Sequence, residues 1–258
     1  MNLQIENKFF IVCGAGSGFG KATALALAAE NAQVLAVSRT GEKLSALKNK
    51  YPKNIQPFAG DLTNSLTLSE IAVTASEKKL SGVFFNAGGP PAGTFNEITL
   101  NQWDEAWKLV IRWKIELTKL LIPQLIKQQY GRLVYLESVS VKQPVENLML
   151  SNSLRAAMVG FVKTLSNETA KHNITANVLA PGYHRTAAIN RLIAKKSQQN
   201  NITEKEAEKL FTDEVPVGTM GNPDDLATLA TWLLSPLSRY VTGQTISHDG
   251  GLARGFFG

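Results

Sequence analysis

The chain has 258 residues, of which 44% are hydrophobic, and this is enough to bury the core of a single α/β domain. Its 27 Lys and Arg against 21 Asp and Glu give a net charge of +6, but the charges are scattered, so a nucleic-acid partner is not expected. The same charge balance suits an anionic small ligand. Because residues 1–8 are too polar for a signal peptide and no apolar run reaches the roughly 18 residues of a membrane span, we expect a soluble, cytoplasmic protein.

Short apolar runs alternate with longer helical patterns, an order typical of a parallel sheet with helices on both faces. Runs such as 34–37 are apolar at successive positions, as expected when both faces of a strand are buried. The single cysteine, Cys13, lies in such a run and excludes an intramolecular disulfide. The predicted strands are 8–13, 33–37, 55–59, 82–86, 131–137, 174–179 and 243–247. The predicted helices are 18–30, 41–50, 64–79, 101–129, 152–171 and 223–235, within one domain spanning 1–258.

The segment 187–214 interrupts this regular alternation. It is polar and rich in Lys, Gln and Asn, yet residues 204–210 have a helical pattern. This composition fits a solvated pair of surface helices, and it equally fits a mobile lid over a substrate pocket. Both interpretations stay open from the sequence.

A glycine-rich turn follows the first predicted strand and leads directly into a helix. Glycines allow the backbone to turn sharply and to approach a pyrophosphate, while the helix N-terminus presents free N–H groups and the positive end of its dipole. The spacing is Gly-x-x-x-Gly-x-Gly, which differs from G-x-G-x-x-G because Phe19 occupies the third glycine position of that motif. The residues expected to contact a dinucleotide here are Gly14, Ser17, Gly18, Phe19 and Gly20.

This glycine spacing resembles that of the short-chain dehydrogenase/reductase superfamily, including its 3-oxoacyl-(acyl-carrier-protein) reductases, and further motifs extend the resemblance over nearly the whole chain. In that family the corresponding segments contact, in chain order, the adenine ring, the adenine ribose and the nicotinamide carboxamide. The matching residues are Asp61 and Leu62, then Asn86, Ala87 and Gly88, then Pro181, Gly182 and Thr186 of a Pro-Gly-x-x-x-Thr turn. The C-terminal segments 240–244 and 249–251 also follow the family pattern. The resemblance implies a single-domain Rossmann fold, a doubly wound parallel sheet of about seven strands with the ligand at the carboxyl ends of the strands.

The end of the second predicted strand indicates which nicotinamide cofactor is bound. Members that select NAD carry an acidic side chain there, which accepts a hydrogen bond from the ribose 2′-hydroxyl and repels a 2′-phosphate. This chain has Arg39 between Ser38 and Thr40 instead, and a guanidinium can form a forked contact with a phosphate. We therefore expect NADP(H) to be favoured over NAD(H), the alternative being that Arg39 is an ordinary surface arginine.

The catalytic pattern of the family is interrupted in this chain. The family uses a Ser followed by a Tyr-x-x-x-Lys pair. Ser138, at the end of the fifth predicted strand, matches the Ser, but Ser151, thirteen residues later, and Arg155 stand at the positions of the Tyr and the Lys. None of the five tyrosines has a lysine four residues after it, so no shift of register restores the pair. Val110 also stands where many members have an Asn.

These substitutions change the proton chemistry expected at the site. A tyrosine phenol titrates at about 10 and exchanges a proton more readily than an aliphatic hydroxyl such as that of Ser151. Ser151 also fits a role in a helix N-cap, and Arg155 stays charged and can still bind the cofactor ribose. Tyr183, His184 and Lys142 are the alternative proton sources, although each also fits a packing or surface role.

Two classes of function follow. The first is an oxidoreductase that moves a hydride between NADP(H) and a small carbonyl or alcohol substrate, with Ser138 polarising the carbonyl and the loop 88–93 lining the substrate side. The second is a non-catalytic NADP(H)-binding sensor or scaffold. We favour the enzyme, because Ser138 and the nicotinamide-side turn are unnecessary for a module that binds only adenine. We expect no metal site.

The family resemblance also implies a homodimer or homotetramer. Members pair the two long helices that flank the fifth strand, which here are 101–129 and 152–171. Trp103, Trp107 and Trp113 lie in the first of these helices, and the alternative is that they belong to the ordinary core.

Overall fold

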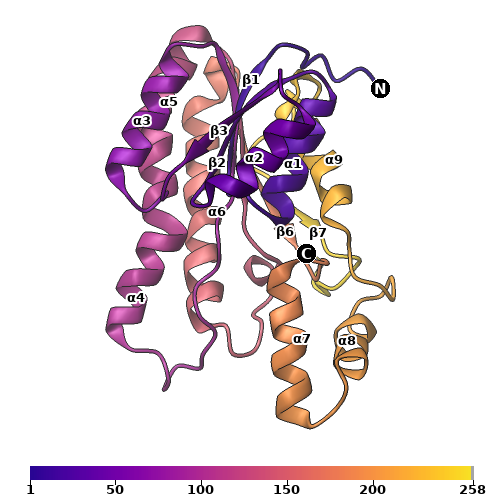
Figure 1. Cartoon of the computed structure of the whole chain (residues 1–258). Coiled ribbons are helices and arrows are strands. Elements are labelled where there is room, and N and C mark those ends of the chain that lie inside the picture. The colour runs from indigo at the N-terminus through magenta and orange to yellow at the C-terminus, as the bar shows by residue number, and fades with distance from the viewer. Residues whose placement is uncertain (257–258) are drawn as a thin grey trace.

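The computed structural model describes residues 1–256, and its strands form one parallel sheet (Figure 1). The sheet in this part of the chain has seven strands in the order β3-β2-β1-β4-β5-β6-β7, which confirms the doubly wound, single-domain fold. β1 and β4 are neighbours where the chain order reverses, which is the place where doubly wound sheets bind ligands. The strands are β1 (Phe9–Cys13), β2 (Gln33–Ser38), β3 (Ile55–Ala59), β4 (Leu80–Phe85), β5 (Gly131–Leu136), β6 (Ile174–Pro181) and β7 (Thr245–His248).

Helices cover both faces of the sheet (Figure 1). Successive residues of β1 contribute to opposite cores: Phe10 packs with α1, α2 and α9, and Ile11 packs with α3, α5 and α6. This two-sided burial explains why the strands read as continuous apolar runs. Within residues 1–256, no helix is both long and apolar enough to cross a membrane. The helices are α1 (Gly18–Ala29), α2 (Gly41–Lys50), α3 (Ser65–Ser76), α5 (Trp113–Gln128), α6 (Met149–Thr169) and α9 (Pro223–Leu234), with 3₁₀ turns at Val139–Val141, Ala170–His172 and Pro236–Ser238.

The predicted helix 101–129 has the expected extent but is not continuous. α4 (Leu100–Trp107) and α5 are separated by a π-helical turn, Lys108–Arg112. The buried Trp113 explains the interruption, because its indole N–H donates to the carbonyl oxygen of Leu109 at 2.8 Å and so competes for a helical acceptor. Such turns inside helices are frequent near functional sites.

The segment 187–214 forms a pair of helices, α7 (Ala187–Asn200) and α8 (Glu204–Asp213), which extends beyond the carboxyl edge of the sheet (Figure 1). Thr203 and Glu206 form a capping box that starts α8. Ile189, Ile193, Ala207 and Met220 form a small core for this pair, separate from the two main cores. The pair therefore has its own packing, distinct from the cores on the two faces of the sheet.

Candidate active site

The glycine-rich turn after β1 is packed so closely that several of its glycines have no room for a side chain. A Cβ on Gly14 would lie 2.6 Å from atoms of Asn86, and one on Gly20 would lie 2.2 Å from the carbonyl oxygen of Gly14. Gly14 and Gly18 have φ values of +65° and +51°, which glycine adopts without strain. The Ser17 side chain accepts no hydrogen bond from the described backbone of α1, so the first N–H groups of that helix remain available to an anion.

The side chain of Asn86 joins the loop after β4 to this turn. Its Nδ2 donates to the carbonyl oxygen of Gly14 at 3.4 Å. Ala87 is half-buried, and a Cβ on Gly88 would meet no described atom within 4 Å. The loop is therefore fixed at Asn86 and open at Gly88.

The end of β2 and the first turn of α2 lie against the glycine-rich turn and carry exposed cationic side chains. A Cβ on Gly16 would lie 2.5 Å from Ser38 Oγ and 3.6 Å from Cδ of Lys43. Arg39 and Lys43 are both exposed, so a positive charge flanks the turn at the position where a 2′-phosphate is expected.

Asp61 and Leu62 follow β3 near Arg39. Leu62 is buried in the core, whereas Asp61 is exposed. The backbone N–H and the hydroxyl of Thr63 donate to Asp61 Oδ1 at 2.9 and 2.8 Å. These hydrogen bonds, the backbone one first, lower the pKa of the Asp61 carboxyl, and the charge of Arg39 adds to the effect.

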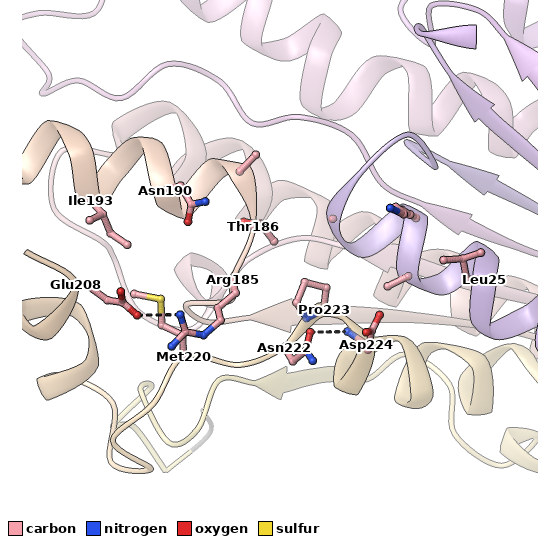
Figure 2. Close-up of a pocket in the computed structure, with 14 residues that line it drawn as sticks. Leu25, Arg185, Thr186, Asn190, Ile193, Glu208, Met220, Asn222, Pro223 and Asp224 are labelled. Atoms are coloured by element: carbon pink, nitrogen blue, oxygen red, sulfur yellow. Dashed lines mark hydrogen bonds and ion pairs between the residues drawn. The ribbon is translucent and has the colours of Figure 1, made fainter. Parts of the chain in front are cut away.

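A cavity of about 660 Å³ lies between α1, α7 and the start of α9 (Figure 2). A Cβ on Gly18 would lie 3.5 Å from Cγ2 of Thr186, so the glycine-rich turn and the predicted nicotinamide-side turn border the same cavity. Arg185 and Glu208 of α8 both line this cavity, and they form an ion pair at 3.0 Å (Figure 2). The structure thus brings the predicted residues Gly18 and Thr186 together.

The predicted catalytic serines both act as hydrogen-bond acceptors. Ser138, half-buried after β5, accepts from the backbone N–H of Ser140 at 3.2 Å. Ser151, buried in the first turn of α6, accepts from Nε of Arg155 at 3.1 Å. Because a hydroxyl can accept and donate at once, each serine can still donate its proton in another direction.

A buried carboxylate holds Arg155 on its other side. Nη1 of Arg155 donates to Glu137 Oε2 at 3.0 Å, and Glu137 Oε1 accepts from Nζ of Lys114 at 2.5 Å. The side chains of Glu137 and Lys114 are 0% and 2% exposed, and that of Arg155 is 10% exposed. Burial lowers the pKa of the Lys114 ammonium, although the Glu137 carboxylate opposes that shift.

The turn after β6 carries Tyr183 and His184, which face different partners. The Tyr183 phenol donates to Glu214 Oε2 at 2.9 Å, and burial raises its pKa. His184 is buried, and its Nδ1 must donate to the carbonyl oxygen of Gly182 at 3.1 Å, so its Nε2 accepts from Nδ1 of His248 at 2.9 Å. The Phe19 ring packs edge-on against His184, with ring centroids 5.0 Å apart, and links the two turns.

Comparisons with known proteins identify the family. A family model described as Enoyl-(Acyl carrier protein) reductase matches residues 14–253. Dehydrogenase/reductase SDR family member 6 from Rattus norvegicus is 30% identical over 250 residues, which cover 96% of this chain and 98% of that protein. This chain belongs to the short-chain dehydrogenase/reductase superfamily.

Two further proteins are similar to this short-chain dehydrogenase/reductase over almost its whole length. The 3-oxoacyl-(acyl-carrier-protein) reductase FabG of Thermotoga maritima is 28% identical over 255 residues, covering 97% of this chain and 99% of that protein. The crystal structure of L-sorbose reductase from Gluconobacter frateurii complexed with NADPH and L-sorbose has a TM-score of 0.93 at 25% identity, covering 99% of this chain and 100% of that one.

Among the side chains at this site that the sequence predictions do not include are Lys114, Glu137 and His248. For Lys114 and Glu137, the sequence does contain features that point to a buried position. Lys114 lies at helical spacing from Leu117 and Leu121, which is the buried face of α5, and Glu137 ends an apolar strand. His248 has no such feature, because its pairing with His184 depends on β7 lying beside β6.

Proposed function

We propose that this short-chain dehydrogenase/reductase is an NADP(H)-dependent oxidoreductase that interconverts a small carbonyl substrate and the corresponding alcohol. The observation that carries the proposal is the convergence of the glycine-rich turn, Arg39 and Ser138 at one edge of the sheet. The similarity to a 3-oxoacyl-(acyl-carrier-protein) reductase and to an L-sorbose reductase complexed with NADPH supports both the reaction and the cofactor.

The described residues fit a bound NADP(H). The glycine-rich turn has no room for a Cβ at positions 14, 16 and 20, so its backbone is free to approach a pyrophosphate, and the N-terminus of α1 supplies donors. Arg39 and Lys43 supply positive charge for a 2′-phosphate. The other proposed contacts are Asp61 and Leu62 for adenine, Asn86, Ala87 and Gly88 for its ribose, Arg155 for the second ribose, and Pro181, Gly182 and Thr186 for the nicotinamide.

When bound, NADPH supplies a hydride to the carbonyl carbon, and a proton must reach the carbonyl oxygen. Ser138 is suited to donate a hydrogen bond to that oxygen, because its own oxygen already accepts from Ser140. Ser151 is suited to deliver or relay the proton, because the guanidinium of Arg155 stabilises negative charge on its oxygen. Tyr183 is a weaker candidate, since its phenol donates to Glu214 and has a raised pKa. We therefore propose an atypical site that works without the Tyr-Lys pair.

We propose that α7 and α8 form a lid over the substrate. They border the cavity beside Thr186, and the side chains of their ion pair with the turn, Arg185 and Glu208, are 63% and 34% exposed. Exposed ion pairs contribute at most about 1 kcal/mol, so this contact allows opening and closing.

The proposal is tested by titrating the native protein with NADPH and NADH while cofactor oxidation is followed over a panel of ketones and 3-oxoacyl thioesters. We expect NADPH binding together with slow oxidation, and Ser138→Ala should reduce the oxidation rate by about 100-fold, the loss typical of one oxyanion donor. Ser153→Ala, an exposed serine of the same helix as Ser151, is the control and should leave the rate unchanged. Binding without turnover of any carbonyl would instead indicate a sensor or scaffold.

A further inference from the structure

We propose that Glu137 is a positioning residue, which orients Arg155 toward the ribose on the nicotinamide side of the cofactor, and that Lys114 holds Glu137 in place. The inference rests on the proposed binding of NADP(H). It concerns two side chains that belong to none of the family motifs described above, and that connect α5, the end of β5 and α6.

The carboxylate of Glu137 is held at both oxygens. Oε1 accepts from Lys114 and Oε2 accepts from Arg155, and the backbone N–H of Glu137 donates to the carbonyl oxygen of Leu179 at 2.8 Å. With one cation on each oxygen, the carboxylate cannot rotate without losing a charge-assisted hydrogen bond in a buried environment. Glu137 is therefore a fixed acceptor for Arg155.

The guanidinium of Arg155 is in turn fixed at two of its three nitrogens. Nη1 is bonded to Glu137 and Nε to Ser151, which defines the plane of the group. Two anchors on one planar group leave little freedom for its remaining donors. The direction of those donors is thus set by protein atoms before any ligand arrives.

The remaining nitrogen of the guanidinium, Nη2, lies beside the loop after β4. Nη2 of Arg155 donates to no atom of residues 1–256, and it lies 3.2 Å from the position that a Cβ on Gly89 would take. The neighbouring Gly88 has open space around it. Two N–H donors therefore stand next to an open part of the cofactor site, where a pair of ribose hydroxyls can accept both.

Loss of Glu137 would have different consequences for ligand binding if the three charges were only structural than if Glu137 positions Arg155. If the three charges only join α5, β5 and α6, their loss should reduce stability and affect all ligands equally. If Glu137 acts through Arg155 on the nicotinamide ribose, its loss should affect only ligands that contain that ribose. Adenosine 2′,5′-bisphosphate, which lacks the nicotinamide half, distinguishes the two.

The experiment measures dissociation constants of NADPH and of adenosine 2′,5′-bisphosphate by calorimetry. For Glu137→Gln we expect about tenfold weaker NADPH binding, the loss of one charge-assisted hydrogen bond, with the bisphosphate constant unchanged. Because Glu137→Gln leaves two buried cations without an anion, the double variant Lys114→Met with Glu137→Gln restores the charge balance and should show the same selective loss. Glu116→Gln, which removes a carboxylate from the exposed Arg112–Glu116 pair of α5, is the control and should change neither constant.

A double-mutant cycle shows whether Glu137 acts through Arg155. We expect Arg155→Met to weaken NADPH binding by itself, and Glu137→Gln to add nothing in that background. Additive effects, an unchanged NADPH constant in Glu137→Gln and in the charge-balanced double variant, or an equal loss for both ligands would overturn the positioning role while leaving the proposed function intact. Failure of the native protein to bind either ligand would overturn the proposed function, and this inference with it.

Discussion

At the end of β2 an exposed guanidinium stands where an NAD-selective enzyme has a carboxylate. Arg39→Asp should weaken NADPH binding by about 30-fold, since a hydrogen bond between charged groups contributes about 2 kcal/mol, and should bring NADH affinity level with or above it. Fluorescence titration of both cofactors measures the change. Equal affinity of the native protein for NADPH and NADH would show that Arg39 is an ordinary surface arginine.

The proposed replacement of the Tyr-Lys pair by Ser151 and Arg155 gives a second prediction. Losing a positioned general acid costs about 10²- to 10⁴-fold in rate, so Ser151→Tyr with Arg155→Lys should raise ketone reduction by at least about tenfold. Lys at 155 keeps a positive charge facing Glu137. Initial rates of NADPH oxidation measure the gain. An unchanged rate, in a variant that still binds NADPH, would mean that proton transfer follows another route.

The pair of imidazoles beside the glycine-rich turn predicts a pH dependence of stability. Burial lowers the pKa of His184 below its ordinary value of 6.5, and protonated His184 would place an N–H against the N–H of His248. As the pH falls below 6.5, the unfolded chain binds a proton that the native protein does not, so the free energy of unfolding decreases. The contribution of His184 is complete above 6.5 and lost below it.

Urea unfolding on both sides of pH 6.5 measures this effect. His184→Asn should flatten the dependence of the unfolding free energy on pH, whereas His172→Gln, in a 3₁₀ turn before β6, serves as the control variant. The same slope in native protein and His184→Asn would refute the role of the imidazole pair.

At the scale of elements, the close packing of the first turn of α1 against the end of β1 requires a glycine at position 20. Gly20→Ala places a Cβ 2.2 Å from the carbonyl oxygen of Gly14, so the first turn of α1 must shift away from the phosphate site. We expect NADPH affinity to fall by at least about tenfold, as one charge-assisted contact is lost. Gly160→Ala in α6, where an added Cβ meets no described atom, is the control and should bind NADPH normally. Calorimetric titration that finds native affinity in Gly20→Ala would contradict the assignment of this turn.

Most helices and strands were predictable because the spacing of apolar residues within a short segment indicates its secondary structure. The strands are apolar on successive residues, since helices cover both faces, and their predicted bounds agree with the structure within a few residues. The π-helical turn was not predictable, because it depends on where the indole of Trp113 packs in the folded protein. Element boundaries set by tertiary packing carry no periodic signal.

The two halves of the candidate site differ in how far the sequence could point to them. Its cofactor side follows from motifs whose residues are close in sequence, such as the glycine-rich turn. The contacts of Glu137 depend on residues 23 and 18 positions away, in α5 and α6, and the sequence showed only single charges in apolar segments. Long-range pairing of buried charges needs the three-dimensional fold, which is why Lys114 and Glu137 appeared only in the structure.

At the scale of the whole molecule, we predict a homodimer or homotetramer that pairs α5 and α6. The three tryptophans differ in burial: Trp113 lies in the core, Trp103 is partly buried against it, and Trp107 is 44% exposed. Leu120 of α5 is 41% exposed, which leaves apolar surface on that helix. Light scattering should find an oligomer, and Leu120→Glu should shift it toward the monomer. A native protein that is monomeric at micromolar concentration would rule out the pairing.

Transfer of the cofactor's hydrogen to a substrate tests the central claim most directly. NADPH carrying deuterium at C4 of the nicotinamide is incubated with the native protein and a panel of ketones and 3-oxoacyl thioesters, and the alcohols are analysed by mass spectrometry. This measurement detects turnover even when reaction at the proposed atypical site is slow. We predict that a deuterated alcohol forms, from NADPH in preference to NADH, and that its yield is much lower with Ser138→Ala. Tight NADPH binding with no deuterium in any alcohol would contradict it and leave a protein that binds the cofactor without using it.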